Sequence, residues 1–271
     1  MTGNKPYWEE KGLDCSSQVR MKGHARVLQE LMPDVVGGQE VNMQMQLDLK
    51  LSCMALGLPY TILWGNMTPI IYRADRLELL DTEYMLYPAN EVGYDGAFND
   101  AKSKSANLAV FRLKENGEVF IFLTTHLWWK VGNDPSSPYY QEGSDIVRVR
   151  QIKMALDLID KYQQKYNGCP VFLVGDLNSL YHSEAVQYAL QHQGYSHAHD
   201  IATEFAHGGK GMNPCAPAGI GPWEDGTFED AIDHILVRDF SNLTLRRFDR
   251  YTPDYYIYLS DHAPVFVDIE F

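Results

Sequence analysis

Acidic, amide and imidazole side chains follow apolar runs at five places in this chain of 271 residues. The five segment ends are Gln39-Glu40, Thr125-His126, Gly175-Asp176-Leu177-Asn178, Asp233-His234 and Ser260-Asp261-His262. A carboxylate at the end of a buried apolar strand is costly unless it meets a cation, a hydrogen-bonding partner or water. Five such ends in one chain therefore predict that several strands converge on a polar pocket.

The apolar runs that precede these side chains predict an alternation of helices and strands. Apolar residues at helical spacing predict helices over residues 17–32, 43–56, 144–166 and 183–192. Apolar and β-branched runs predict strands over 34–40, 60–64, 69–73, 77–87, 108–113, 119–124, 170–174, 231–237 and 263–269. Segments 127–143 and 207–228 are predicted to be loops. This pattern favours a mixed sheet with helices outside, and the lack of a glycine-rich turn after a strand argues against a Rossmann fold.

The composition limits the classes of function. The chain has 23 Lys and Arg against 36 Asp and Glu, a net charge of −13. Such a surplus of carboxylates disfavours nonspecific adhesion to nucleic acid or anionic lipid, and it suits a site that collects divalent cations. Hydrophobic residues make up 45% of the chain and charged residues 22%, a balance typical of a globular protein and not of a disordered one.

The sequence also bears on the compartment. No apolar run is long enough to span a bilayer, so no stable membrane insertion is expected. No secretory signal is visible, so the expected location is cytoplasmic, or outside the cell if a signal peptide has been removed. Cys15, Cys53, Cys169 and Cys215 are widely scattered. They are predicted to be unlinked thiols, with one disulfide as the alternative for an exported protein.

The polar strand ends resemble the motifs of the endonuclease/exonuclease/phosphatase superfamily, whose members are metal-dependent phosphoesterases. The matching segments occur in the family's order and are PDVVGGQEV (33–41), TTHL (124–127), VGDLNS (174–179), AIDHILV (231–237) and SDHAPV (260–265). The resemblance implies a four-layered α/β sandwich, in which two mixed β-sheets pack face to face with helices outside. It also implies a single domain over residues 1–271.

The resemblance assigns a metal and the residues that act with it. Glu40 matches the family's metal-binding glutamate, and Asp261 matches a second acidic group at the metal. The metal is expected to be Mg²⁺ or Mn²⁺, since carboxylate oxygens suit such hard cations. Asp176 is expected to orient or deprotonate the attacking water. Asn178 is expected to hydrogen-bond the phosphoryl oxygens, although a turn that bonds its own backbone is the alternative for these two residues.

Three histidines receive different expectations. The resemblance implies that His262 stabilises the charge on the scissile phosphate as imidazolium, and that Asp233 orients His262 and raises its pKa. His126 is expected to contact the phosphate, with a buried structural histidine as the alternative. Neighbouring residues of a strand face opposite ways, so Asp233 and His234 cannot both enter the site and His234 is assigned to structure.

Some candidates are weaker. Arg73 ends an apolar strand and would suit a phosphate, but a surface salt bridge is the commoner outcome. Asn107 is a further candidate. Trp128 and Trp129 follow His126 and would form either an aromatic wall beside the substrate or ordinary packing. The family's first strand ends in a metal-binding asparagine; Asn4 is the matching candidate, but it lacks apolar residues before it, so this strand is expected to be truncated or frayed.

The predicted function is Mg²⁺-dependent hydrolysis of a phosphomonoester or phosphodiester. The negative charge and the lack of a Lys/Arg run favour a small phosphorylated substrate, such as a sugar, inositol or lipid head group. A nuclease acting on DNA or RNA is the alternative, and no protein partner is indicated. An inactive relative that binds a phosphorylated ligand is the alternative of another class. A serine hydrolase is disfavoured because there is no G-x-S-x-G motif.

Overall fold

The computed structural model describes residues 12, 14–192, 194–205, 231–251, 253–256 and 259–271. The predicted loop 207–228, Asn4 and Cys215 lie outside these residues. Cys15, Cys53 and Cys169 are free thiols, so the described part of the chain contains no disulfide. Within the same part, no helix is both long and apolar enough to cross a membrane.

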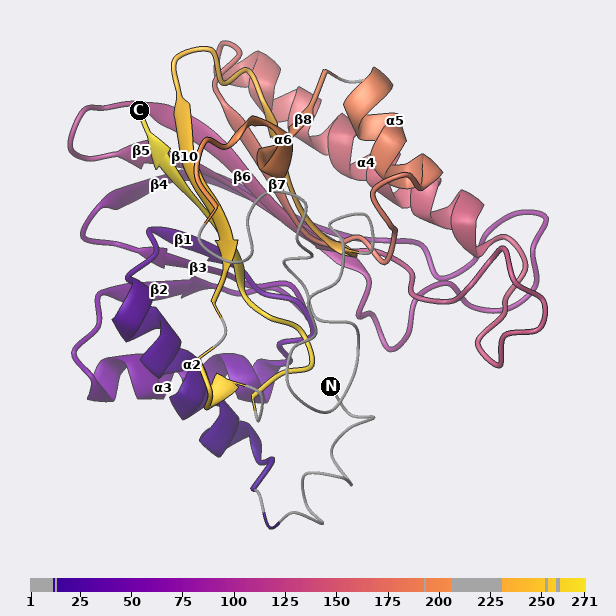
Figure 1. Ribbon diagram of the computed structural model, residues 1–271, viewed down its shortest axis with the longest axis horizontal. Coiled ribbons are helices and arrows are strands. Elements are labelled where there is room, and N and C mark those ends of the chain that lie inside the picture. Colours follow the sequence, from indigo (N-terminus) through magenta and orange to yellow (C-terminus); the bar gives the residue numbers. More distant parts are fainter. Residues whose placement is uncertain (1–11, 13, 193, 206–230, 252, 257–258) are drawn as a thin grey trace.

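The strands form two packed sheet layers (Figure 1). The larger sheet has six strands in the order β4 (Leu77–Leu86), β5 (Ser105–Leu113), β6 (Val119–His126), β7 (Val171–Asp176), β9 (Asp233–Arg238) and β8 (Ser196–His197). The other layer contains the order β1 (Val35–Gly37), β3 (Ile70–Arg73) and β2 (Tyr60–Leu63), and the pair β10 (Thr244–Arg250) and β11 (Val265–Glu270). In the larger sheet β6 and β7 run parallel while the other neighbours are antiparallel, so the sheet is mixed.

Helices cover both outer faces. The helices α2 (Ser17–Leu31) and α3 (Met43–Ala55) pack on the three-stranded sheet β1-β3-β2 (Figure 1). The helices α4 (Ser144–Lys165) and α5 (Glu184–His192) pack on the six-stranded sheet. A short helix, α6 (Ala198–Ile201), follows β8. The predicted four-layered α/β sandwich is therefore confirmed.

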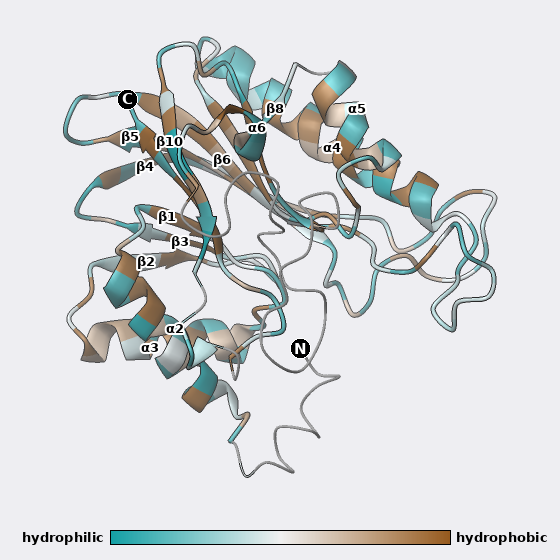
Figure 2. Ribbon diagram, viewed as in Figure 1, coloured by the Kyte–Doolittle hydropathy of each residue, from teal (hydrophilic) through white to brown (hydrophobic). Residues whose placement is uncertain are grey.

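Three apolar clusters fill the spaces between the four layers. One joins α4 and α5 to the six-stranded sheet, one lies between the two sheet layers, and one joins α2 and α3 to the three-stranded sheet. Figure 2 shows the corresponding pattern, with apolar colour along the central strands and mixed colour on the helices. Burial of both faces explains why β5, β6 and β7 have nearly continuous apolar sequences.

Local signals explain the helix ends. The Ser16 hydroxyl accepts a hydrogen bond from the Val19 N–H at the start of α2, and Met32 adopts a left-handed conformation just before Pro33 at its end. The Asn42 side chain caps α3 in the same way by accepting from the Met45 N–H. The observed helix ends lie within a few residues of the predicted ends because these local signals can be recognised in the sequence.

Two strands, β8 and β10, were not predicted. The sequence of β10 does not indicate a strand because its apolar side chains do not alternate: Leu245 and Phe248 are both buried but lie three positions apart. A shift of register between Leu245 and Arg247 against β11 supplies the extra residue. The two-residue strand β8 and the helix α6 were also missed, since both are too short to show a period.

Two strand edges face a common cavity. Among the described strands, β1 pairs with β3 alone and β11 with β10 alone. A cavity of about 970 Å³ is lined by both strands, and Val36, Phe266 and Phe122 of β6 are among its lining residues. The lining also includes Glu40, Asp176, Asp233, Asp261 and His262. Four polar strand ends that were predicted to converge therefore border one space.

Candidate active site

The strand register sets three polar side chains at one level of the larger sheet. His126 at the end of β6 pairs with Asp176 at the end of β7, and Asp176 pairs with Asp233 at the start of β9. Partners in register point to the same face, so the three side chains lie side by side. β6 and β7 approach closely at Gly175, where φ is +146° and a Cβ atom would lie 1.9 Å from the Thr125 carbonyl oxygen.

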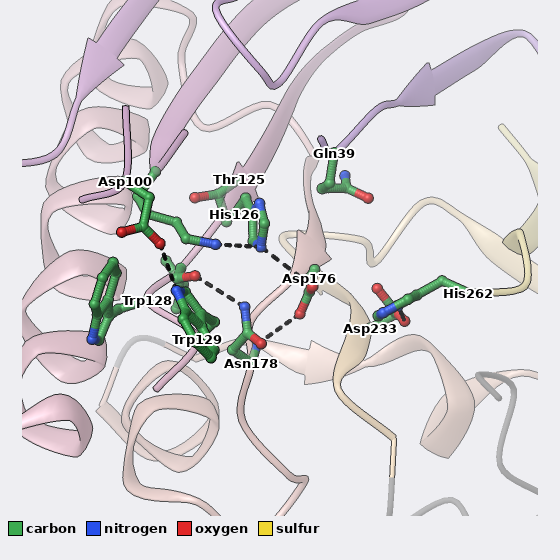
Figure 3. Close-up of polar contacts among 12 residues, drawn as sticks. Gln39, Asp100, Thr125, His126, Trp128, Trp129, Asp176, Asn178, Asp233 and His262 are labelled. Carbon is green, nitrogen blue, oxygen red and sulfur yellow. Dashed lines mark hydrogen bonds and ion pairs between the residues drawn. The ribbon is translucent and has the colours of Figure 1, made fainter. Parts of the chain in front are cut away.

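His262 completes this row from the segment that leads into β11. Its Nδ1–H donates to the Asp233 Oδ2 at 2.7 Å (Figure 3). The negative charge of Asp233 is the main cause that raises the pKa of His262 to about 10, against the opposing effect of burial. His262 is therefore an imidazolium near neutral pH. Ligand atoms of Asp176, Asp233 and His262 all lie within 4.8 Å of one another.

Asp176 is buried at the centre of the site. Burial raises the pKa of this carboxyl, and the charge of Asp233 raises it further, while His262 and Lys104 act in the opposite direction. The Asn178 backbone N–H donates to Asp176 Oδ1 at 2.9 Å. The Asn178 side-chain amide donates to the Leu127 carbonyl oxygen at 3.0 Å, so the turn after β7 is tied to the end of β6 (Figure 3).

Lys104 is a site residue that the sequence did not reveal. Its side chain is buried, and its Nζ lies 2.6 Å from His126 Nε2, which in turn lies 3.4 Å from Asp176 Oδ2. Burial lowers the pKa of Lys104 to about 8, although the charges of Asp176 and Glu40 oppose this shift. The signal was hidden because β5 begins at Ser105, three residues before the predicted strand, and only that start places Lys104 beside the end of β6.

The two predicted metal ligands lie farther along the same cavity. Glu40 follows β1, has a left-handed backbone with φ of 57°, and lines the cavity together with Asp261. The buried Arg20 of α2 interacts electrostatically with Asp261 and Glu40. Burial lowers the pKa of this guanidinium, while the charges of Asp261 and, more weakly, Glu40 raise it. Asp261 therefore already lies near a cation, and Arg20 is a second charged residue that the motifs did not indicate.

The sequence profile of the Endonuclease/Exonuclease/phosphatase family matches residues 19–262. The chain belongs to this family. A comparison with curated protein sequences found no significant match.

Solved structures of the endonuclease/exonuclease/phosphatase fold cover nearly the whole chain. A family protein from Bacteroides vulgatus is 21% identical, with a TM-score of 0.68 over 93% of this chain and 90% of that one. The mannosyl-6-phosphatase Bt3783 of Bacteroides thetaiotaomicron is 19% identical, with a TM-score of 0.69 over 98% and 95%. TDP2 of D. rerio, complexed with a single-strand DNA product, is 18% identical, with a TM-score of 0.66 over 96% and 95%. At these identities the similarity shows the fold alone.

The weaker candidates of this family member fall mostly outside the site. Arg73 forms ion pairs with Asp75 at 2.6 Å and with Asp34 at 3.6 Å, which is the surface role given as its commoner outcome. Asn107 is buried, and its amide donates to the Thr68 carbonyl oxygen at 3.0 Å. Trp128 is fully buried, whereas Trp129 is 37% exposed. Of the aromatic pair, Trp129 is therefore the one that can meet a ligand.

His126 and His234 differ in what they contact. His126 is buried between Lys104 and Asp176, and no described residue hydrogen-bonds its Nδ1. Its contact with a phosphate stays a prediction. His234 faces away from Asp233, as its neighbouring position on β9 requires, and is buried beside His197.

Proposed function

We propose that the protein hydrolyses a phosphoester bond of a small phosphorylated molecule with the help of Mg²⁺ or Mn²⁺. The observation that carries the proposal is the group formed by Asp176, Asp233 and His262, whose ligand atoms lie within 4.8 Å of one another. A carboxylate suited to activating water and an imidazolium suited to neutralising phosphoryl charge thereby meet at one point. Membership of the family is independent support.

The acidic residues suit a hard divalent cation. Burial and the charge of Asp233 raise the pKa of Asp176, so its ionised form gains from a cation nearby. Glu40 lines the same cavity and offers carboxylate oxygens, the ligands that Mg²⁺ prefers. We assign the cation to Glu40, with Asp261 as a second acidic group. The bound cation supplies Lewis-acid polarisation of a phosphoryl oxygen.

The protein's own residues account for the other needs of the reaction. Asp176 orients the attacking water and accepts its proton. Asn178 hydrogen-bonds a phosphoryl oxygen through the amide that Leu127 holds in place. His262, kept protonated by Asp233, stabilises the negative charge that builds on the phosphoryl group. Lys104 adds a second buried cation, and His126 Nε2 accepts a hydrogen bond from it on the side of Asp176 away from His262 (Figure 3).

The exposed aromatic rim favours a substrate that carries a sugar ring. Trp129 follows two residues after Leu127, whose carbonyl oxygen accepts from the Asn178 amide. The Trp129 indole N–H donates to Asp100 Oδ2 at 2.6 Å (Figure 3). Tyr139 is 58% exposed and packs edge-on against Trp129, with ring centroids 5.5 Å apart. A fixed aromatic face suits the C–H groups of a sugar ring, and an adjacent carboxylate accepts hydrogen bonds from its hydroxyls.

The charge of the chain favours a small substrate over a polymer. A net charge of −13 repels the sugar-phosphate backbone of a nucleic acid, whose binding depends on several Lys and Arg contacts. Two of the similar folds point in opposite directions, since one is a mannosyl-6-phosphatase and the other was solved with single-strand DNA. The rim and the charge support a phosphorylated sugar as the substrate.

A substrate panel tests the proposal. Wild-type protein and Asp176→Ala would be assayed with hexose 6-phosphate, inositol phosphate, glycerol 3-phosphate, phosphocholine lipid and a DNA oligonucleotide, each with Mg²⁺, Mn²⁺ or EDTA. We expect turnover only with metal, fastest on the hexose phosphate, and a loss of about 10²-fold or more in Asp176→Ala. Full activity in EDTA or in Asp176→Ala would contradict the mechanism. Binding of these ligands without turnover at any metal concentration would indicate an inactive relative.

A further inference from the structure

Three buried histidine residues form a hydrogen-bonded chain behind the active site. The His199 backbone N–H donates to His197 Nδ1 at 3.1 Å, His197 Nε2 lies 3.0 Å from His234 Nδ1, and His234 Nε2 lies 2.7 Å from the Ser179 carbonyl oxygen. All three residues are buried. The chain therefore joins β8 and β9 to the turn that follows β7.

These contacts allow one arrangement of protons on the two rings. The Ser179 carbonyl oxygen can only accept, so His234 Nε2 must carry the hydrogen. In a neutral ring Nδ1 is then an acceptor, and it takes the hydrogen of His197 Nε2. This leaves His197 Nδ1 as the acceptor for the His199 backbone N–H. Burial lowers the pKa of both His197 and His234, which agrees with two neutral rings.

The chain ends on the turn 177–179, which carries Asn178 and directly follows Asp176 at the end of β7. Ser179 directly follows Asn178, whose backbone has a φ of 46° and whose N–H donates to Asp176. The Leu177 N–H donates to the Ile232 carbonyl oxygen at 2.9 Å, and the Asn178 amide holds the Leu127 carbonyl oxygen. His234 adds a hold at the far end of the turn. A left-handed residue such as Asn178 is costly to keep in place unless its surroundings determine it.

We propose that His234 and His197 are positioning residues: His234 holds the turn 177–179 so that Asp176 and Asn178 keep their reactive geometry, and His197 fixes the tautomer with which His234 does so. The inference rests on the proposed hydrolytic function. One strand, β9, then serves the site from both faces, with Asp233 orienting His262 on one side and His234 bonding Ser179 on the other. Groups that orient a first set of reactive residues in this way commonly change activity by about 10- to 100-fold when removed.

The alternative is that the histidines only fill space in the core. Leu236 offers a matched control because it lies on the same strand and the same face, two residues farther from the site, and is fully buried. Its truncation removes apolar packing and leaves the contact with Ser179 intact. If His234 acts by packing alone, its variants should behave like Leu236→Ala when all are assayed below their unfolding temperatures.

The experiment compares His234→Phe, His234→Gln and Leu236→Ala in steady-state kinetics with Mg²⁺ and the best substrate of the panel. We expect His234→Phe to lower kcat by about 10- to 100-fold with little change in KM. His234→Gln should recover most of kcat, since its amide Nε2 can donate to the Ser179 carbonyl oxygen. Leu236→Ala should lose thermal stability and keep kcat.

A second variant covers the case in which His234→Phe does not fold. His197→Phe leaves His234 in place, and ¹⁵N NMR should show the His234 ring shift from one tautomer to a mixture while kcat falls. An active wild type whose His234→Phe variant keeps kcat, or whose His234 tautomer and kcat are unchanged in His197→Phe, would overturn this inference alone. A wild type inactive on the whole panel would overturn the proposed function and this inference with it.

Discussion

Lys104 and His126 share a hydrogen bond on the floor of the site, with 2.6 Å between Nζ and Nε2. An ammonium group can only donate, so His126 Nε2 is the acceptor and the imidazole is neutral, in line with its lowered pKa, for which burial is the main cause. The pair therefore carries one positive charge, on Lys104. His126 lies between that charge and Asp176, with 3.4 Å between His126 Nε2 and Asp176 Oδ2 (Figure 3).

Replacing Lys104 by Met should lower kcat/KM by about 10²-fold, because one stabilising cation is lost from the phosphoryl site. Burial places the pKa of Lys104 at about 8. Its charge is thus present below pH 8 and lost above it, so KM of the wild type should rise as the pH passes 8. Lys104→Met should lack this rise, and Lys102→Met, at an exposed position in the same loop, is the control. Equal kinetics in the two variants would remove Lys104 from the site.

Asp233→Asn should lower the pKa of His262 from about 10 toward its ordinary value near 6.5, because the charge of Asp233 is the main cause of the shift. The ion pair between His262 and Asp233, which raises this pKa, stabilises the folded protein. Its contribution is fully present below pH 6.5 and is lost as the pH rises toward 10. NMR titration of the His262 ring measures the shift directly. Asp268→Asn, an exposed position on β11, should leave it unchanged. An unshifted ring in Asp233→Asn would disprove the pairing.

Asp176→Asn should lose activity and gain stability in the absence of metal. Burial raises the pKa of Asp176, so the ionised carboxylate costs stability as the pH rises above its unfolded value near 4. Differential scanning calorimetry should show a higher unfolding temperature for the variant at pH 7, by about 2–4 °C for each kcal/mol, and no difference near pH 4. Mg²⁺ should raise the unfolding temperature of the wild type more than that of the variant. A variant less stable than the wild type at pH 7 would count against this account.

Trp129→Ala should lower kcat/KM for hexose 6-phosphate by about 3- to 10-fold and leave glycerol 3-phosphate nearly unaffected, because only the hexose has a ring to pack on the indole. Tyr84→Ala, which removes an exposed aromatic residue of β4, is the control. Equal losses on the two substrates would mean that Trp129 shapes the rim without contacting the sugar.

The sequence predicted most of the fold because apolar periodicity is strong in this chain. Where it failed, pairing between distant segments decided the structure. The start of β5 is an example: Ser105 and Asn107 are small or polar, yet both are buried, and the Ser105 hydroxyl shares a hydrogen bond with the Thr68 hydroxyl at 2.8 Å. In β10 the bulge near Arg247 hides the alternation that a strand would otherwise show.

The site was predictable only where motif residues end strands. Glu40, Asp176, Asp233, Asp261 and His262 all border one cavity, while their individual roles stay predictions. Lys104 and Arg20 could not be found in the same way, because lysine and arginine are usually exposed and nothing in the local sequence marks these two as buried. Their burial follows from long-range contacts, such as that of Arg20 Nε with the Leu259 carbonyl oxygen at 2.9 Å.

The close approach at Gly175 has a consequence for altering the enzyme. A methyl group at this position would collide with the Thr125 carbonyl oxygen, so even alanine would push β7 away from β6. His126 and Asp176 are paired across that seam, one residue farther along. Mutational libraries meant to change substrate preference should therefore vary the aromatic rim freely and keep position 175 as glycine, since a larger residue there would move His126 away from Asp176.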